Sequence, residues 1–342
     1  MIPSIGKAVN LLLAGQSLSA EQTQAAFEAV MDGQANEVEI ASLLTALRAN
    51  GETVEELTGA ARVMSERATK IICQTRGLLD TCGTGGDSLH TFNISTATAL
   101  VAAAAGVPVA KHGNRSVSSS SGSADVLEAL GVNIQLTPEQ TAKCIDEVGI
   151  GFCFAQLVHG AMKYAAPVRK QLGFRTIFNL LGPLTNPAGA EYQLLGANTP
   201  EFAEKIAGAL LALGRERAIV LCGNGELDEV SLWGETDIWR VENGTVIHEK
   251  WNAESFGISE CNVSELQVNS AAESAAIIQK IFEGEAGPAR DIVLANSAAA
   301  LLVAGKAATP QEGVSLGAEA IDSGQALTTL NRLIEFTQGT GS

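Results

Sequence analysis

Short apolar runs alternate with helix-like segments from about residue 73 to the C-terminus. Strand-like runs lie at 77–79, 107–110, 152–155 and 218–222, and helix-like segments lie at 95–105, at 123–130, from 137, from 199 and, in an Ala-rich tail, over 270–336. Strands that alternate with helices predict a mainly parallel sheet. In such a sheet the loops that follow the strands meet at one edge, where ligands bind. We therefore predict an α/β domain with a ligand site at that edge.

The N-terminal part of the chain predicts helices only. Three capping boxes follow one another, namely Ser19 with Gln22, Asn36 with Glu39 and Thr53 with Glu56. Each box marks the start of a helix. A further helical stretch at 162–181 is expected to return to this small domain. We predict an all-helical domain over 1–72, completed by about 162–185, and an α/β domain formed by 73–161 and 186–342.

A glycine-rich segment, Gly-Thr-Gly-Gly-Asp at 83–87, follows the first strand-like run. Glycines permit positive φ and close backbone approach, so successive N–H groups can converge on an anion. A helix N-terminus behind the segment adds to the attraction. The segment matches neither the G-x-G-x-x-G pattern of dinucleotide sites nor the Gly-Lys-Ser/Thr ending of a P-loop. It predicts a phosphate-binding loop, with a plain tight turn as the alternative.

A basic, hydroxyl-rich segment at 111–123 follows the second strand-like run. Lys111 and Arg115 offer positive charge, while Asn114 and several serines offer hydrogen-bonding groups. By itself the segment fits a polar surface loop with helix-capping serines equally well. Beside the glycine-rich segment, it predicts a pocket for a ligand with two separate phosphate groups, such as phosphoribosyl diphosphate.

Acidic and basic side chains elsewhere offer complementary chemistry. Asp228 and Glu229 follow the strand-like run at 218–222. Adjacent carboxylates at that edge suit Mg²⁺, with substrate phosphates completing its coordination; the alternative is a solvated acidic turn. Arg169 can grip a carboxylate through two parallel hydrogen bonds, or lie on a helix surface as an ordinary arginine.

Composition argues against several classes of protein. The net charge of −16 disfavours nucleic acid or an anionic membrane as the main partner. No apolar run reaches the roughly 18 residues that span a bilayer, and the N-terminus shows no export signal. The six cysteines form no C-x-x-C pair, which argues against zinc, and no nucleophile motif is present. We expect a cytoplasmic protein with reduced thiols.

Several motifs follow one another along the chain, at 83–87, 93–96 (Asn-Ile-Ser-Thr), 111–115 (Lys-His-Gly-Asn-Arg), 121–128, 175–187 and 227–229 (Leu-Asp-Glu). In this order they resemble the anthranilate phosphoribosyltransferase family over nearly the whole chain. The resemblance implies a nucleoside phosphorylase/phosphoribosyltransferase-like fold. It implies transfer of the phosphoribosyl group from phosphoribosyl diphosphate to anthranilate, with release of diphosphate, in tryptophan biosynthesis. It also implies two Mg²⁺ ions per subunit and a homodimer joined through the helical domain.

The resemblance assigns site residues position by position. Those for phosphoribosyl diphosphate are Gly83, Gly86, Asp87, Thr91, Asn93, Ile94, Ser95, Thr96, Lys111, His112, Gly113, Asn114, Arg115, Ser116, Val117, Ser118, Ser119 and Ser123. Those for anthranilate are Gly83, Asn114 and Arg169, and those for magnesium are Ser95, Asp228 and Glu229. No catalytic acid or base is assigned, so the expected catalysis rests on positioning and metal assistance.

Three positions depart from the family pattern. Gln156 and Gly160 stand where prolines are usual, and Ser120 stands where a lysine is common. All lie near the expected path of anthranilate. Two other functions stay open. A pyrimidine nucleoside phosphorylase shares the architecture but needs no paired acidic magnesium site, and a non-catalytic homologue that binds nucleic acid should lose the acidic pair and gain a basic surface.

Overall fold

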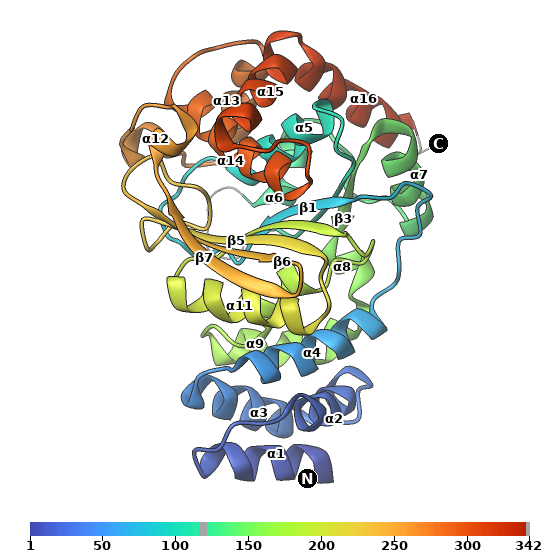
Figure 1. Cartoon of the computed structure of the whole chain (residues 1–342). Helices are drawn as coiled ribbons and strands as arrows, with labels where there is room; N and C mark the ends of the chain where they lie inside the picture. The colour runs from blue at the N-terminus through green and yellow to red at the C-terminus, as the bar shows by residue number, and fades with distance from the viewer. Residues whose placement is uncertain (116–121, 340–342) are drawn as a thin grey trace.

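The computed structural model of the chain describes residues 1–115 and 122–339. Its N-terminal part consists of α1 (Pro3–Leu13), α2 (Ala20–Met31), α3 (Glu37–Asn50) and α4 (Val54–Arg67), at the bottom of Figure 1. The last three begin at the predicted capping boxes, each with both of its reciprocal hydrogen bonds. These bonds satisfy backbone N–H groups that a helix start leaves without partners. The all-helical prediction for this part is confirmed.

A seven-stranded sheet forms the centre of the remaining chain, in the order β3-β2-β1-β4-β5-β6-β7. The strands are β1 (Leu79–Gly83), β2 (Val109–Gly113), β3 (Ile150–Phe154), β4 (Tyr192–Gly196), β5 (Arg217–Gly223), β6 (Thr236–Glu242) and β7 (Thr245–Trp251). Neighbours among β1–β5 are parallel, and β6 and β7 add an antiparallel hairpin. The predicted mainly parallel sheet is confirmed. The hairpin was not predicted. The prediction relied on strands that alternate with helices, and no helix separates β6 from β7.

The strands that carry the predicted ligand site extend further than the apolar runs indicate. β1 and β2 begin at 79 and 109 rather than at 77 and 107, and they end at 83 and 113 rather than at 79 and 110. Gly83, Lys111, His112 and Gly113 therefore lie in strands, which corrects the prediction that they belong to loops. The reason is backbone pairing. β1 pairs with β4 up to Gly83 and Gly196, and β2 pairs with β3 up to Gly113, whatever the polarity of the side chains.

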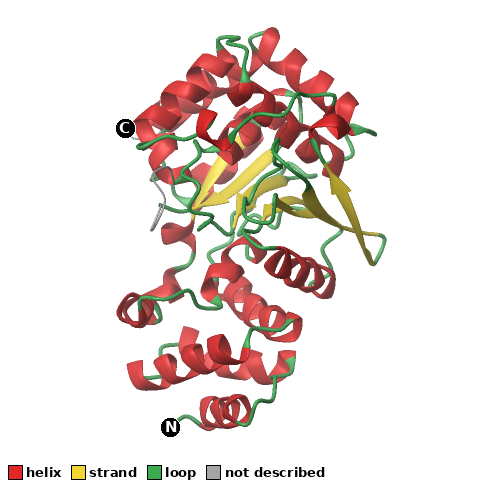
Figure 2. Ribbon diagram, turned by 90° about the vertical axis from the view of Figure 1, so that its left-hand side faces the viewer, coloured by secondary structure: helices red, strands yellow, loops and turns green. Residues whose placement is uncertain are grey.

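Helices cover both faces of the sheet (Figure 2). The remaining helices of the chain are α5 (Ile94–Ala104), α6 (Ser123–Ala129), α7 (Pro138–Val148), α8 (Ala155–Val158), α9 (Ala166–Leu172), α10 (Phe178–Leu181), α11 (Pro200–Ala212), α12 (Ala253–Phe256), α13 (Ala271–Phe282), α14 (Pro288–Val303), α15 (Pro310–Asp322) and α16 (Gln325–Gly339), with the 3₁₀ turns η1 (Gly160–Tyr164), η2 (Gly182–Leu184) and η3 (Val263–Glu265). The expected helical stretch at 162–181 is broken, because Gly173 adopts φ 68° and ends α9. Within the described residues, no helix is long and apolar enough to cross a membrane.

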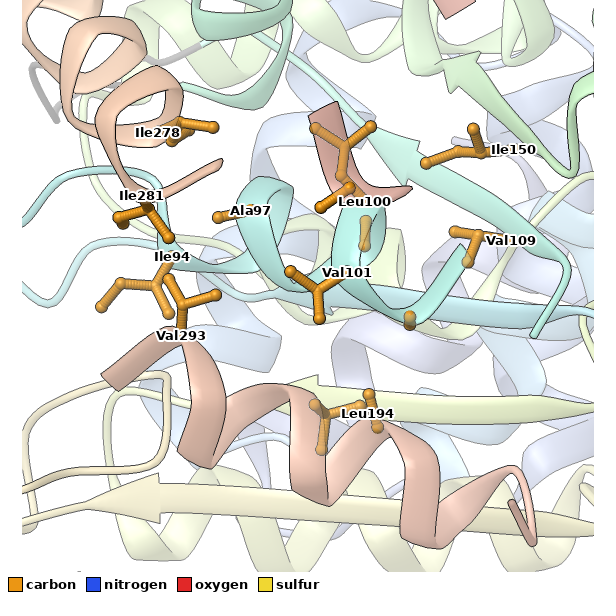
Figure 3. Close-up of a cluster of buried hydrophobic side chains, with 14 of the residues drawn as sticks. Ile94, Ala97, Leu100, Val101, Val109, Ile150, Leu194, Ile278, Ile281 and Val293 are labelled. Carbon is orange, nitrogen blue, oxygen red and sulfur yellow. The ribbon is translucent and has the colours of Figure 1, made fainter. Parts of the chain in front are cut away.

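The parallel part of the sheet is buried on both faces, whereas the edge strand β7 is mostly exposed. Along β5, Ile219 and Leu221 join the core under α5 and α13–α16, whereas Val220 and Cys222 join the core on the side of α11 and the N-terminal helices. Strands buried on both faces read as continuous apolar runs, which is why β5 was visible in the sequence. Figure 3 shows the first core, where the side chains of α5 lie between the sheet and α13 and α14. This packing fixes the start of α5 against the strand ends.

The segment between β3 and β4 packs onto the N-terminal helices. The Phe178 ring of α10 lies 5.6 Å from the Phe27 ring of α2, centroid to centroid. Val168 of α9 and Leu181 of α10 are buried in the same core as α2, α3 and α4. The chain thus returns to the helical part before it re-enters the sheet at β4, so side chains on α9 are positioned by the helical part.

Candidate active site

The site lies where the strand order of the sheet reverses. From β1 the chain continues through β2 and β3 on one side, and through β4 and β5 on the other. In open parallel sheets, ligands bind at the carboxyl ends of the strands at this switch point. The glycine-rich segment follows β1, the basic segment begins in β2, and the acidic pair follows β5. The sheet therefore brings the predicted segments to one edge.

The glycine-rich segment is held from both sides. Arg175 Nη1 donates to the carbonyl of Gly85 at 3.0 Å, and Asn198 Nδ2 donates to the carbonyl of Gly86 at 3.0 Å. Gly86 has φ 79°, and a Cβ there would collide with the Arg175 guanidinium. Only glycine fits this combination of left-handed backbone and close approach. Arg175 belongs to a motif that the sequence singled out, but its supporting role, like that of Asn198, emerges only from the fold.

The acidic segment contacts the glycine-rich segment directly. Asp228 Oδ2 accepts a hydrogen bond from the backbone N–H of Gly85 at 2.7 Å. A Cβ on Gly83 would collide with the same carboxylate. The absence of a side chain at Gly83 therefore lets Asp228 approach the end of β1. The first and third predicted segments thus meet at one edge of the sheet.

The acidic pair has the electrostatics of a cation site. Burial, followed by repulsion from Asp87, raises the pKa of Asp228 to about 7. Burial and then Asp228 raise the pKa of Glu229 well above its usual range, while Lys111 opposes the shift. Carboxylates that repel each other in a poorly solvated place are stabilised as anions by a divalent cation. Their oxygen atoms suit Mg²⁺.

The acidic pair does not form a complete metal cage by itself. Among residues 1–115 and 122–339, no group of three or more His, Cys, Asp or Glu side chains could hold a metal ion. Magnesium commonly keeps water and substrate phosphates as ligands. The donor set of Asp228, Glu229 and the Ser95 hydroxyl therefore fits a magnesium ion that arrives with a phosphorylated substrate.

Lys111 connects β2 with the start of α5. Its side chain is only 2% exposed, and its ammonium donates to the carbonyl of Thr81 at 2.5 Å and to Ser95 Oγ at 3.2 Å. Burial lowers the pKa of Lys111, and Asp80 most strongly opposes that shift. Asn93 Oδ1 caps α5 by accepting from the Thr96 N–H at 2.9 Å. The predicted residues Lys111, Asn93 and Ser95 are therefore brought together.

Not every predicted residue presents its side chain to the pocket. Ile94 and Thr96 are 1% exposed, and Ile94 points into the core in Figure 3. Thr91 pairs with Gln267 in an isolated bridge. Asp87 does face the acidic pair, since burial and then the charge of Asp87 raise the pKa of Asp228, and its Oδ1 also accepts from the Leu89 N–H at 3.2 Å. Any ligand contact made by Ile94 has to come from its backbone.

His112 forms a buried, directional pair with His159. His112 Nδ1 lies 3.1 Å from the carbonyl oxygen of Gly182, and the two Nε2 atoms are 3.2 Å apart. Because a carbonyl only accepts, Nδ1 of His112 carries its hydrogen, and its Nε2 accepts from His159. Burial lowers the pKa of His112 to about 4 and that of His159 to about 3. Both rings are neutral at pH 7, so His112 brings no charge to a phosphate.

Arg115 is engaged by acidic side chains. Its guanidinium lies 3.0 Å from Asp125 Oδ1 and donates to Glu128 Oε1 at 2.9 Å. The hydrogen bonds that it donates to Glu128 and then to Asp125 raise the pKa of Arg115. Ser123 Oγ donates to the carbonyl of Asn114 at 3.3 Å. The remaining predicted residues of this segment, Ser116, Val117, Ser118 and Ser119, and the departing Ser120, lie outside the described residues.

The sequence also matches known proteins. Residues 75–327 match the model described as the α/β domain of a glycosyl transferase family, and residues 7–68 match its helical bundle domain. An anthranilate phosphoribosyltransferase from Acetivibrio thermocellus is 52% identical over 331 residues, which cover 97% of this chain and 96% of that protein. This chain belongs to the anthranilate phosphoribosyltransferase family. The family resemblance found in the motifs is confirmed.

Solved members of the family share the whole fold. The enzyme from Thermus thermophilus has a TM-score of 0.91 at 42% identity, covering 97% of this chain and 99% of that one. The enzyme from Saccharomyces cerevisiae, in complex with PRPP (phosphoribosyl diphosphate) and Mg, has a TM-score of 0.91 at 27% identity, with 99% of both chains covered. A further yeast structure, in complex with 4-fluoroanthranilate, has a TM-score of 0.89 at 26% identity, with 98% of both chains covered.

The residues expected to meet anthranilate lie on separate elements of this family member. Asn114 follows β2, and its Oδ1 accepts from Gln156 Nε2 at 3.3 Å. Arg169 lies on α9, 5.2 Å from the centroid of the Phe178 ring and 3.5 Å from Asn179 Oδ1. Burial lowers the pKa of Arg169. A partly buried guanidinium with one long hydrogen bond keeps donors for a carboxylate.

The departures from the family pattern have different surroundings. Gln156, at the start of α8, reaches the expected anthranilate residue Asn114. At Gly160 in η1, an added Cβ would meet no atom within 4 Å. Gln156 therefore contacts an expected site residue directly, whereas Gly160 leaves space.

Proposed function

We propose that this chain transfers the phosphoribosyl group of phosphoribosyl diphosphate to the amino group of anthranilate, releasing diphosphate, in tryptophan biosynthesis. The observation that carries the proposal is the Asp228–Gly85 hydrogen bond, which joins a phosphate-type glycine loop to a magnesium-type acidic pair at one sheet edge. Family membership supports it, because yeast relatives hold PRPP with Mg, or 4-fluoroanthranilate.

The proposed roles follow the chemistry of each group. The glycine loop and the start of α5 would bind the diphosphate through backbone N–H groups. Asp228, Glu229 and Ser95 would hold two magnesium ions per subunit, which, when bound, neutralise the departing diphosphate. The residues at 111–119 with Ser123 would hold the phosphoribosyl part, and Arg169 and Asn114 would hold anthranilate.

The reaction requires positioning more than proton chemistry. The bond between ribose C1 and the diphosphate oxygen breaks as the bond between C1 and the aromatic nitrogen forms, and the nitrogen then loses a proton to solvent. An aromatic amine is neutral at pH 7, so it needs little activation. Holding it on the face of C1 opposite the diphosphate inverts C1. Such orientation can supply roughly 7–11 kcal/mol of barrier reduction.

We also propose the domain division, assembly and location expected from the sequence. The helical domain 1–72 would be completed by 162–185, which accords with the burial of Phe178 against Phe27. A homodimer through this domain accords with the exposed apolar side chains of Leu13 and Val38, which are 75% and 72% accessible. A cytoplasmic location accords with six free cysteines.

One assay tests the proposed activity against both alternatives. Purified protein is incubated with Mg²⁺, phosphoribosyl diphosphate and anthranilate, and anthranilate fluorescence should fall. A pyrimidine nucleoside phosphorylase would instead release base from thymidine in the presence of phosphate, and a nucleic-acid-binding homologue would shift DNA in a gel at physiological salt. Neither alternative has support, because the acidic pair is retained and the net charge is −16.

A further inference from the structure

Asn296 binds the backbone next to the acidic pair. It lies in the middle of α14 and is 0% exposed. Its Oδ1 accepts from the Val230 N–H at 2.8 Å, and its Nδ2 donates to the carbonyls of Val230 at 3.2 Å and of Ile292 at 2.9 Å. One amide therefore satisfies both backbone groups of Val230, the residue that follows Glu229.

The acidic pair is a short span between fixed points. On its N-terminal side, Leu227 and Gly223 exchange two backbone hydrogen bonds of 2.8 Å. On its C-terminal side, the backbone of Val230 is bound by Asn296. The next residue, Ser231, donates its N–H to Thr236 Oγ1 at 3.0 Å. Leu227 and Val230 are 0% exposed. With both ends fixed, the backbone of Asp228 and Glu229, and hence the directions in which their side chains leave it, is restricted as well.

The next residue on α14 provides a contrast. Ser297 is also 0% exposed, but its hydroxyl has no hydrogen-bond partner among the described residues. A buried polar side chain is costly unless it is hydrogen-bonded. Asn296 has its donors and acceptor engaged by backbone, and most of these bonds go to Val230. The burial of the Asn296 amide is therefore explained by its hydrogen bonds to the backbone of Val230.

We infer that Asn296 is a positioning residue for the magnesium-binding pair: by clamping Val230 from α14, it sets the orientation of Asp228 and Glu229 toward the pocket. The inference rests on the proposed function, since it takes the pair as magnesium ligands. Groups that orient metal ligands commonly change metal affinity or activity by roughly 10–100-fold when they are mutated. Asn296 itself touches neither substrate nor metal.

The experiment compares Asn296→Leu and Asn296→Ala with Ser297→Ala, a change of a neighbouring buried polar residue that holds no loop. Mn²⁺ binding to each full-length protein is measured by electron paramagnetic resonance with phosphoribosyl diphosphate present and anthranilate absent. We expect the Asn296 variants to bind Mn²⁺ roughly tenfold more weakly. The Mg²⁺ concentration for half-maximal activity should rise in parallel, while the KM for anthranilate stays unchanged. Ser297→Ala should match the wild type in all three.

Hydrogen exchange of the wild-type protein adds a test that needs no variant. The Val230 amide should exchange as slowly as the core of α14. Wild-type Mn²⁺ affinity in a folded Asn296 variant would overturn the inference, as would equal weakening in Ser297→Ala or fast exchange at Val230. A different result would show that the proposed metal role itself is wrong. In that case the double variant Asp228→Asn with Glu229→Gln would bind Mn²⁺ as the wild type does.

Discussion

The carboxylate of Asp228 accepts a hydrogen bond from the backbone N–H of Gly85 at 2.7 Å, across 143 positions of sequence. A backbone N–H that binds a carboxylate is equally suited to a phosphate oxygen. The contact therefore couples the group proposed to hold magnesium to the loop proposed to hold diphosphate.

Removing the acidic pair should remove magnesium-dependent turnover. In Asp228→Ala with Glu229→Ala, we expect kcat to fall by roughly 10²–10³, the usual loss when a group that stabilises developing charge is deleted. Steady-state kinetics at several Mg²⁺ concentrations give the measurement. Glu226→Ala, an exposed acid of the same turn, is the matched control and should behave as wild type. Unchanged turnover and magnesium dependence in the double variant would refute the assignment.

Crowding the glycine loop should weaken binding of phosphoribosyl diphosphate. Gly86→Ala places a Cβ at φ 79° against Arg175, and left-handed backbone alone costs a residue about 1–2 kcal/mol. We expect the KM for phosphoribosyl diphosphate to rise roughly tenfold, which corresponds to about 1.4 kcal/mol. Gly189→Ala, at φ 69° with no neighbour within 4 Å, carries the same backbone strain outside the site. It should lower stability and leave this KM unchanged.

Removing the guanidinium of Arg169 should weaken anthranilate binding specifically. Hydrogen bonds to charged groups contribute about 1.5–3 kcal/mol, so Arg169→Met should raise the KM for anthranilate at least tenfold. Arg169→Lys should restore little, because an ammonium lacks the planar pair of donors. Lys170→Met, on the same helix, is the control. An equal rise in the KM for phosphoribosyl diphosphate would show that Arg169 acts on the whole fold.

Gln156 should affect the binding of anthranilate through its hydrogen bond to Asn114. Gln156→Ala removes the hydrogen bond to Asn114, and the net contribution of such a bond is about 0.5–1.5 kcal/mol. We expect the KM for anthranilate to change about two- to tenfold, with the KM for phosphoribosyl diphosphate much less affected. Leu157→Ala, also in α8 and 41% exposed, serves as the comparison. The idea fails if both variants give the same anthranilate kinetics.

The His112–His159 pair should make the fold sensitive to acid. Burial lowers the pKa of these rings to about 4 and about 3, whereas unfolded histidines titrate near pH 6.5. Between pH 6.5 and about 4, the two histidines therefore bind protons in the unfolded chain but not in the folded chain. The resulting stability is complete above pH 6.5 and is lost as the pH falls toward 4, by up to about 1.4 kcal/mol per pH unit for each histidine.

His159→Gln should reduce this acid sensitivity. Urea unfolding at pH 6.5, 5.5 and 4.5 should show a shallower loss of stability in the variant than in the wild type. His248→Gln is the control, because that side chain is 48% exposed and lies outside the buried pair. Parallel pH profiles for all three proteins would contradict the expected role of the buried pair.

Local sequence signals predicted individual elements well. Capping boxes at Ser19, Asn36 and Thr53 are visible because both partners lie within one helical turn. The strand β5 is visible because it is buried on both faces and so is apolar throughout. The limits of β2 were predicted less well, because pairing with β3 carries it through Lys111 and His112.

The sequence did not predict contacts between residues far apart in the chain. Nothing near Arg175 or Asn198 in the chain indicates that each would hold a carbonyl of the glycine loop. Nothing near Arg115 indicates that Glu128 would engage its guanidinium. These contacts depend on which elements the fold places side by side, and a linear motif does not contain that information.

The family, the helical and α/β parts and the chemical character of each site segment can be read from the chain alone, because capping, periodicity and motif spacing are properties of neighbouring residues. Which polar groups are engaged in structural contacts and which meet at the edge of the sheet is known only from the folded molecule. Burial, partner choice and pKa depend on distances between segments more than a hundred residues apart, such as Asp228 and Gly85. Those distances are set by the strand order of the sheet.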